Sequence, residues 1–207
     1  MARVLVVRAH PLGAQSSRTM RLTDEFVRAY TAAHPDDAIA DVRLFDRAVP
    51  EIDLDLLNAW RELAAGTPFA HLTLNEQAKV TLFNGYTDQF MASDKIVIAN
   101  PLWNLQVPTR LKAWLDMTCV AGTSFRYNEA GEAEGLVHGK KALHIQTSGG
   151  LFDHRDPASV YVRSLMQFMG VTDFTDISAE GMDHDPEHAA DILDDAQRRL
   201  VEFAKIF

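Results

Sequence analysis

The sequence predicts an α/β fold, a doubly wound, five-stranded parallel sheet with helices on both faces. Two observations support this prediction. Segments such as Arg3–Ala9 and Lys95–Ala99 are apolar without alternation, as strands are when helices cover both of their faces. Segments with helical spacing separate these strands along the chain, and such alternation is typical of parallel sheets. Because crossovers between parallel strands are right-handed, few topologies remain possible.

The first half of the chain alternates predicted strands and helices around one irregular region, residues 46–74. Thr73 and Glu76 have the spacing of a capping box, which predicts the start of a long helix. In chain order we expect the strand Arg3–Ala9, the helix Ser17–Ala33, the edge strand Asp41–Leu44, the short helix Leu54–Leu63, a long helix to about Met91 and the strand Lys95–Ala99.

The second half continues the pattern with one interruption, a Gly- and Glu-rich segment from Phe125 to Leu136 that can form a hairpin. For the terminal helix, Asp185 is the predicted N-cap, and Pro186 and Glu187 suit its first turn. The other expected elements are the helix Thr109–Val120, the strand Lys141–Gln146, the helix Val160–Met169 and the strand Asp173–Ser178. With no internal repeat, residues 1–207 are expected to form one domain.

Composition excludes several classes of protein. Hydrophobic residues make up 47% of the 207 residues and charged residues 24%, values typical of soluble globular proteins. The formal net charge of −9 argues against a nucleic-acid-binding surface. The first apolar run is too short for a signal peptide, no stretch approaches a membrane span, and Cys119 has no disulfide partner. We therefore expect a cytoplasmic protein without nucleic-acid or membrane partners, whose redox chemistry, if any, needs a cofactor.

The segment Asn100–Lys112 follows a predicted strand directly and carries Trp103, Asn104 and two prolines. Ligands of open parallel sheets bind beyond the carboxyl ends of the strands. There, irregular backbone offers polar groups and Trp103 offers a stacking surface, which together suit a flavin. This segment taken alone fits equally a strand-to-helix turn whose tryptophan fills a surface groove.

Two more loops leave the same predicted sheet edge. The loop His10–Thr19 lacks the G-x-G-x-x-G and P-loop patterns, but its serines, Thr19 and Arg18 surround a helix N-terminus, which favours a phosphate. Read alone, Ser16 or Ser17 could simply cap the helix. The loop Thr147–Gly150 has two glycines, which let a ligand approach the backbone, although such pairs are usually turns. Together the three loops describe a site for a flavin mononucleotide.

The chain resembles the FMN-dependent NADH-azoreductases, which also act as NAD(P)H–quinone oxidoreductases, over nearly its full length. The most specific matching segment is Ala121–Tyr127. The others are Val4–Val7, Ser17–Thr19, Pro101–Leu105, Pro108–Leu115, Glu134–Val137, Gly139–Lys141, Thr147–Gly150 and Ala179–Gly181. Thr19 and His10 stand where that family often has serine, and Leu102–Leu105 replaces Met-Tyr-Asn-Phe. The resemblance fades in residues 46–74, which are expected to influence acceptor choice.

The resemblance implies a flavodoxin-like strand order, 2-1-3-4-5, and a ping-pong reaction. NADH or NADPH would reduce bound FMN, and a quinone or azo compound would reoxidise it. No metal and no side-chain acid or base is predicted. Backbone N–H groups of Trp103–Leu105 and Ser148–Gly150 would stabilise the reduced flavin. Phe125 and Tyr127 are the predicted substrate-stacking residues of a homodimer, although the two aromatic residues fit equally a role in anchoring their loop. The predicted FMN-binding residues are His10, Ser17, Arg18, Thr19, Pro101, Leu102, Trp103, Asn104, Leu105, Thr147, Ser148, Gly149 and Gly150.

Two other functions remain open from the sequence. One is a flavodoxin-type electron carrier without NAD(P)H activity, and the other is a flavin-free binding module. Among the remaining titratable residues, His184 and His188 could hold a metal but are expected on a solvated acidic face. His144, within an apolar strand, is expected to be a hydrogen-bonded core histidine.

Overall fold

The computed structural model describes all 207 residues, and its centre is a five-stranded sheet with every neighbouring pair parallel. The strand order is β2-β1-β3-β6-β7. Because β6 and β7 are the fourth and fifth strands of this sheet, the predicted order 2-1-3-4-5 is confirmed. The strands are β1 (Arg3–Arg8), β2 (Ala38–Arg43), β3 (Lys95–Pro101), β6 (Lys141–Thr147) and β7 (Asp173–Ala179).

Six α-helices connect or follow these strands, and two of them, α2 and α3, lie between β2 and β3. The capping box at the start of the third helix is confirmed, with Thr73 and Glu76 each bonding the backbone of the other. The helices are α1 (Arg18–Ala33), α2 (Leu54–Ala64), α3 (Leu74–Ala92), α4 (Thr109–Thr118), α5 (Pro157–Phe168) and α6 (Ala189–Ala204). Short 3₁₀ turns, η1 (Leu44–Asp46), η2 (Phe69–His71) and η3 (Pro186–His188), lie between them.

The predicted starts of the last two helices were wrong. Helix α5 begins at Pro157 rather than Val160, because Asp156 caps it by accepting a hydrogen bond from the Ser159 N–H. Asp185 caps nothing, since its carboxylate pairs with the His188 side chain instead. The residues after Asp185 therefore form only the turn η3, and α6 begins at Ala189.

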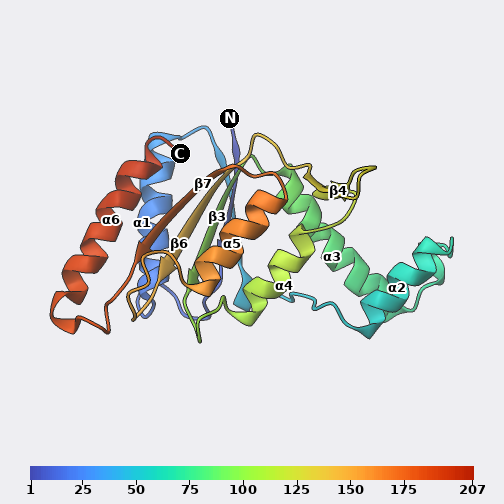
Figure 1. The fold of residues 1–207 in the computed structure, drawn as a ribbon, viewed down its shortest axis with the longest axis horizontal. Helices are drawn as coiled ribbons and strands as arrows, with labels where there is room; N and C mark the ends of the chain where they lie inside the picture. The colour runs from blue at the N-terminus through green and yellow to red at the C-terminus, as the bar shows by residue number, and fades with distance from the viewer.

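Helices lie on both faces of the sheet (Figure 1). Helices α1 and α6 pack together on one face, over β3, β6 and β7, and α3, α4 and α5 lie on the other. Helix α2 packs on α3 and extends beyond the sheet at the side of the molecule. None of the helices combines the length and the apolar character that crossing a bilayer requires.

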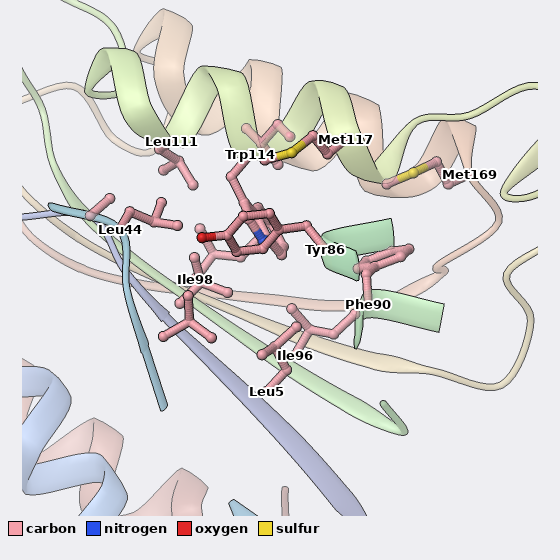
Figure 2. Close-up of a cluster of buried hydrophobic side chains, with 14 of the residues drawn as sticks. Leu5, Leu44, Tyr86, Phe90, Ile96, Ile98, Leu111, Trp114, Met117 and Met169 are labelled. Atoms are coloured by element: carbon pink, nitrogen blue, oxygen red, sulfur yellow. The ribbon is translucent and has the colours of Figure 1, made fainter. Parts of the chain in front are cut away.

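The larger core cluster lies between the sheet and helices α3 and α4 (Figure 2). Trp114 is completely buried there, and its ring meets Phe90 at a centroid distance of 6.1 Å. Leu111, in the first turn of α4, is also completely buried. Burying a leucine side chain contributes about 1.5–3 kcal/mol. This packing fixes the start of α4, and with it the loop that connects β3 to α4.

A separate antiparallel hairpin, β4 (Phe125–Tyr127) and β5 (Ala133–Gly135), confirms the predicted hairpin. It packs against the C-terminal end of α5, where the Val137 N–H donates to the carbonyl of Met169 at 2.8 Å. The chain then enters the amino end of β6. The hairpin therefore lies at the opposite end of the sheet from the three predicted site loops (Figure 1).

Candidate functional site

The three predicted loops meet at the carboxyl edge of the sheet. They follow the adjacent strands β1, β3 and β6. The ring of His10, from the first loop, lies 5.3 Å from the ring of Trp103, from the second. The Leu102 N–H donates to the carbonyl of Thr147, in the third, at 2.9 Å. The structure thus brings together the elements that the sequence assigned to one site.

The first loop leads into the N-terminus of α1. Ser17 is the N-cap, and its hydroxyl accepts a hydrogen bond from the Met20 N–H at 3.3 Å. The backbone N–H groups of Arg18 and Thr19 have no partner. Because unpaired N–H groups and the helix dipole favour an anion, this turn suits a phosphate. A hollow of about 230 Å³ lies here, lined by Ala14, Gln15, Ser16, Ser17, Arg18, Arg21 and Leu193.

The Thr19 side chain does not line that hollow. It is buried, and its hydroxyl oxygen lies 2.6 Å from the hydroxyl oxygen of Thr147. This pair ties the first turn of α1 to the end of β6. Thr19 therefore offers its backbone N–H to a ligand at this turn, while its side chain fixes the position of the helix.

The second loop is a tight turn closed by Trp103 and Gln106, whose N–H and C=O groups exchange hydrogen bonds at 3.0 and 2.9 Å. Its two central residues have positive φ, 50° at Asn104 and 62° at Leu105. This conformation is uncommon for leucine. The Trp103 N–H is used inside the turn, so only the N–H groups of Asn104 and Leu105 remain unpaired. Trp103 itself is 40% exposed.

The space beside the two glycines of the third loop is occupied by the ends of other side chains. A Cβ at Gly149 would lie 2.1 Å from a carboxylate oxygen of Asp183, and one at Gly150 would lie 2.7 Å from the ring of Phe152. The Ser148 N–H donates to Ala179 at 2.9 Å, whereas the N–H groups of Gly149 and Gly150 are unpaired. Two backbone donors are therefore free here, not the three that the sequence suggested.

A fourth segment, the loop after β7, completes this edge. The Asp183 and His184 N–H groups both donate to the Gly149 carbonyl, each at 3.0 Å. The Asp183 carboxylate also meets the Arg18 guanidinium at 3.2 Å. Sequence reasoning considered Asp183 only as a neighbour of His184 and His188 on an acidic face, and the only signal for a role here was its position just after the motif Ala179–Gly181.

His10 is held in one tautomer. Its Nδ1 accepts a hydrogen bond from the Leu12 N–H at 3.0 Å, which places the proton of the neutral ring on Nε2. Burial lowers the pKa of the His10 imidazole, and the charge of Arg43 lowers it further. At neutral pH, His10 is therefore an uncharged hydrogen-bond donor at the edge of the site.

The structure does not bring Phe125 and Tyr127 to these loops within the chain. The Phe125 ring packs on Phe168 at a centroid distance of 4.7 Å, at the C-terminal end of α5. The site loops lie near the N-terminus of α5, which has 12 residues and so spans about 18 Å. Tyr127 is 64% exposed. Their predicted substrate role requires a second subunit.

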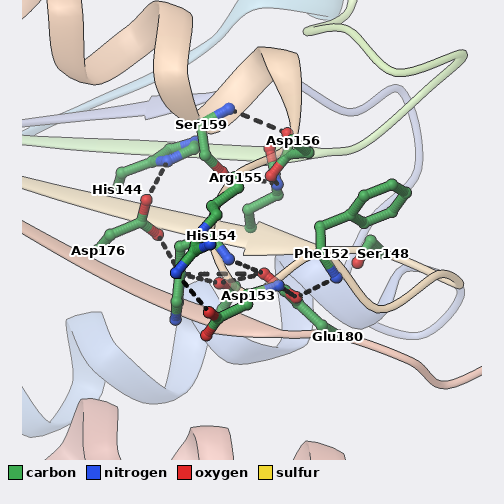
Figure 3. A network of polar contacts seen from close by, with 12 residues as sticks. His144, Ser148, Phe152, Asp153, His154, Arg155, Asp156, Ser159, Asp176 and Glu180 are labelled. Atoms are coloured by element: carbon green, nitrogen blue, oxygen red, sulfur yellow. Dashed lines mark hydrogen bonds and ion pairs between the residues drawn. The ribbon is translucent and has the colours of Figure 1, made fainter.

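A buried polar network lies directly behind the site (Figure 3). His144 Nε2 lies 2.8 Å from the Asn100 side-chain oxygen, and its Nδ1 lies 3.4 Å from the Asp176 carboxylate. Burial alone would raise the pKa of Asp176, but the hydrogen bond and charge of His144, with the charges of His154 and Arg163, lower it overall. His144 is completely buried and bonded on both sides, as expected of a core histidine.

Glu180 shapes the chain that follows Gly150. Its carboxylate accepts hydrogen bonds from the backbone N–H groups of Phe152, Asp153 and His154 at 2.7 to 3.0 Å (Figure 3). Asp153 and His154 have positive φ, 53° and 55°, which these three bonds stabilise. The Phe152 ring is thereby held against Gly150. Glu180 therefore supports the conformation of the glycine loop without belonging to it.

The remaining reactive side chains lie outside the site. His188 pairs with Asp185 on the surface, and that hydrogen bond raises the pKa of His188. No group of three or more His, Cys, Asp or Glu side chains is arranged to hold a metal ion. Cys119 is half-buried, and burial raises the pKa of its thiol, which makes it a weak nucleophile at neutral pH.

Comparisons with known proteins match this architecture over the whole chain. Residues 2–204 match a family model described as flavodoxin-like fold. An FMN-dependent NADH:quinone oxidoreductase of Streptococcus suis is 40% identical over 208 residues, covering 100% of both chains. Its counterpart in Bacillus velezensis is 39% identical over 212 residues, also with 100% coverage of both.

Solved structures give the same result. An azoreductase from Bacillus anthracis superimposes with a TM-score of 0.92 at 29% identity, covering 100% of both chains. An FMN-dependent NADH-azoreductase from Bacillus anthracis, solved in complex with FMN, superimposes with a TM-score of 0.90 at 29% identity, covering 99% of this chain and 98% of the other.

Proposed function

The chain belongs to the flavodoxin-like fold family, and we propose that it is an FMN-dependent oxidoreductase that transfers hydride from NADH to quinones and aromatic azo compounds. The observation that carries this proposal is the full-length match, at 40% identity, to an FMN-dependent NADH:quinone oxidoreductase. The free backbone donors of three loops at one sheet edge support it independently. We take residues 1–207 as one FMN-binding unit.

The residues present fit FMN. The unpaired N–H groups of Arg18 and Thr19 would bind the phosphate at the start of α1. Those of Asn104 and Leu105, and of Gly149–Gly150, would bind polar atoms of the ring system. The same loops bring the other predicted contacts, Pro101, Leu102, Thr147 and Ser148, to this edge. One phosphate-sized hollow, in a sequence without the G-x-G-x-x-G pattern of dinucleotide sites, favours FMN over FAD.

Bound FMN would supply the redox chemistry, accepting hydride from NADH and passing it to the second substrate in a ping-pong sequence. The chain's residues orient the ring and stabilise its charge. Fixed N–H donors aimed at an atom that gains negative charge are effective because they need no reorganisation. Trp103 would provide a stacking surface, and His10 an uncharged donor. We assign no side chain of the site as an essential acid or base.

We further propose a homodimer in which the hairpin of one subunit faces the site of the other. Within the chain, Phe125 and Tyr127 lie away from the site. The segment between α4 and β6 is long, connections of that length are often functional, and dimers with twofold symmetry are the commonest homo-oligomers. Helix α2 and its neighbours also expose an apolar surface suited to a contact, with Leu54, Leu57, Phe69 and Leu74 each at least 42% exposed.

The experiment for the activity is steady-state NADH oxidation with a quinone acceptor, together with mass analysis of the released cofactor. We expect yellow protein, stoichiometric FMN and turnover. Yellow protein without NADH turnover would indicate an electron carrier instead. Colourless protein that does not bind added FMN would indicate a flavin-free binding module, and stoichiometric FAD would refute the cofactor assignment.

The dimer is tested with Tyr127→Asp, because this exposed side chain can change without disturbing the fold. Analytical ultracentrifugation should show loss of the dimer, and turnover should fall with it while FMN remains bound. The ion-paired surface residue Arg198 offers a matched control, Arg198→Gln. A wild-type monomer with full turnover would remove the dimer from the proposal and leave the cofactor assignment intact.

A further inference from the structure

Trp103 is held in place by two neighbouring rings. It belongs to neither core cluster. Its ring meets His10 at a centroid distance of 5.3 Å and an angle of 61°, and Phe45 at 6.4 Å and 71°. Both contacts have the edge-to-face geometry that aromatic pairs prefer. The orientation of Trp103 therefore depends on whether these two rings are themselves fixed.

Phe45 is fixed by Arg110. The guanidinium carbon of Arg110 lies 5.2 Å from the centre of the Phe45 ring, within the range of a cation–π contact. The Nη1 of the same side chain donates to two carbonyls on either side of Phe45, that of Leu44 at 2.9 Å and that of Arg47 at 3.0 Å. Arg110 thus joins helix α4 to the turn η1, which has no side-chain cap of its own.

These contacts form a continuous path from the core to the site. Arg110 precedes Leu111, which is completely buried, so the path starts on a fixed helix. It runs through the Arg110 guanidinium and the Phe45 ring and ends at Trp103. The backbone of Trp103 is held by its bonds to Gln106 and by the neighbouring bond from the Leu102 N–H to Thr147. These bonds fix the backbone but leave the side chain free to rotate about its own torsions. Side-chain contacts are therefore the main restraint on its ring.

We propose that Arg110 and Phe45 are positioning residues, which order Trp103 as a stacking surface before FMN binds. This inference rests on the proposed function. A side chain that is already ordered loses less conformational entropy when a ligand binds. The entropy cost of fixing the side chain then falls on folding and not on binding, so the affinity for the ligand rises. Lysine could not replace Arg110, because it lacks the plane and the fork of donors that meet a ring and two carbonyls together.

The test compares Arg110→Gln and Phe45→Leu with the wild-type full-length chain. Phe45→Tyr keeps the ring and serves as the conservative variant. Arg198→Gln, an exposed arginine on α6 that pairs with Asp195, is the matched loss of charge. The first readout is the fluorescence anisotropy of Trp103 without FMN, obtained by subtracting the signal of each variant's Trp103→Phe version. The second is the dissociation constant for added FMN, with circular dichroism as the check on folding.

We expect lower Trp103 anisotropy and a roughly tenfold larger dissociation constant for FMN in Arg110→Gln and Phe45→Leu, as the ordering cost of one large side chain implies. Phe45→Tyr and Arg198→Gln should match the wild type. If Arg110→Gln fails to fold, Phe45→Leu decides, since it keeps both carbonyl bonds. Unchanged anisotropy would overturn the proposal, as would a mobile Trp103 with unchanged FMN affinity. Wild-type protein that binds no FMN would instead refute the proposed function, and the anisotropy would still decide whether these residues hold Trp103.

Discussion

Replacing Gly135 by alanine should push the hairpin away from the backbone of Met169 and Gly170, against which it packs. A Cβ at Gly135 would lie 2.4 Å from the backbone nitrogen of Gly170 and 2.4 Å from the carbonyl carbon of Met169. Both obstacles are backbone atoms, so no side chain can rotate away. Overpacking of this kind costs about 1–3 kcal/mol. Shifting the hairpin would also stretch the Val137 hydrogen bond to Met169, a further loss of about 1 kcal/mol.

Urea unfolding measures this effect, and Gly85→Ala is its control. Gly85 lies within α3, and no atom lies within 4 Å of the Cβ that alanine would add. That substitution should stabilise the protein by about 0.5–1 kcal/mol, whereas Gly135→Ala should destabilise it by about 2–4 kcal/mol. Folded Gly135→Ala should keep its FMN and lose quinone turnover. Stability within about 0.5 kcal/mol of the wild type would refute the packing argument.

Two other predictions concern charge. Ser17→Asp should abolish FMN retention, measured by flavin absorbance, while the helix survives, because aspartate caps as well as serine but repels a phosphate. Full retention would contradict the phosphate assignment. The hydrogen bonds from Tyr30 and Ala2 lower the pKa of Asp37 to about 2. Ionised Asp37 therefore stabilises the fold at pH values above its unfolded pKa of about 3.9. This stabilisation is lost as the pH falls through the folded-state pKa of about 2. Urea unfolding measured across acidic pH should show that the free energy of unfolding falls less on acidification in Asp37→Asn than in Asp36→Asn. An equal fall in both variants would refute this prediction.

The order of strands and helices could be predicted because it depends on local periodicity. The first residues of the last two helices could not be predicted in the same way. Asp156 and Asp185 are both followed by proline, which favours a helix start at each. Asp156 is completely enclosed and bonds the Ser159 N–H. Asp185 lies at the surface, where its carboxylate pairs with the His188 side chain. Which donor a carboxylate meets depends on the folded structure around it, and the Asp-Pro pattern that both positions share does not contain that information.

The position of the candidate site could be predicted for a topological reason. Loops that follow neighbouring parallel strands must meet at one edge, so a correct strand order brings His10, Trp103 and Gly149 together. The free donors could not be predicted, because they depend on turn type. Pairing of Trp103 with Gln106 removes one expected N–H, and it requires a positive φ at Leu105 that propensity alone argues against.

The residues that support the site were missed because they come from distant segments. Asp183 forms an ion pair with Arg18, although the two residues are far apart in the sequence. Arg110 likewise contacts Phe45, which lies in a distant part of the sequence. None of these contacts has a local pattern. The binding groups themselves are mostly backbone N–H donors, which every non-proline residue carries. The chain can therefore have a net charge of −9 and still present a positive surface to a phosphate, because helix N-termini and left-handed turns, rather than lysines, supply the field. It follows that substitutions changing backbone conformation at Leu105, Gly149 or Gly150 should disturb FMN binding more than removal of surface charge.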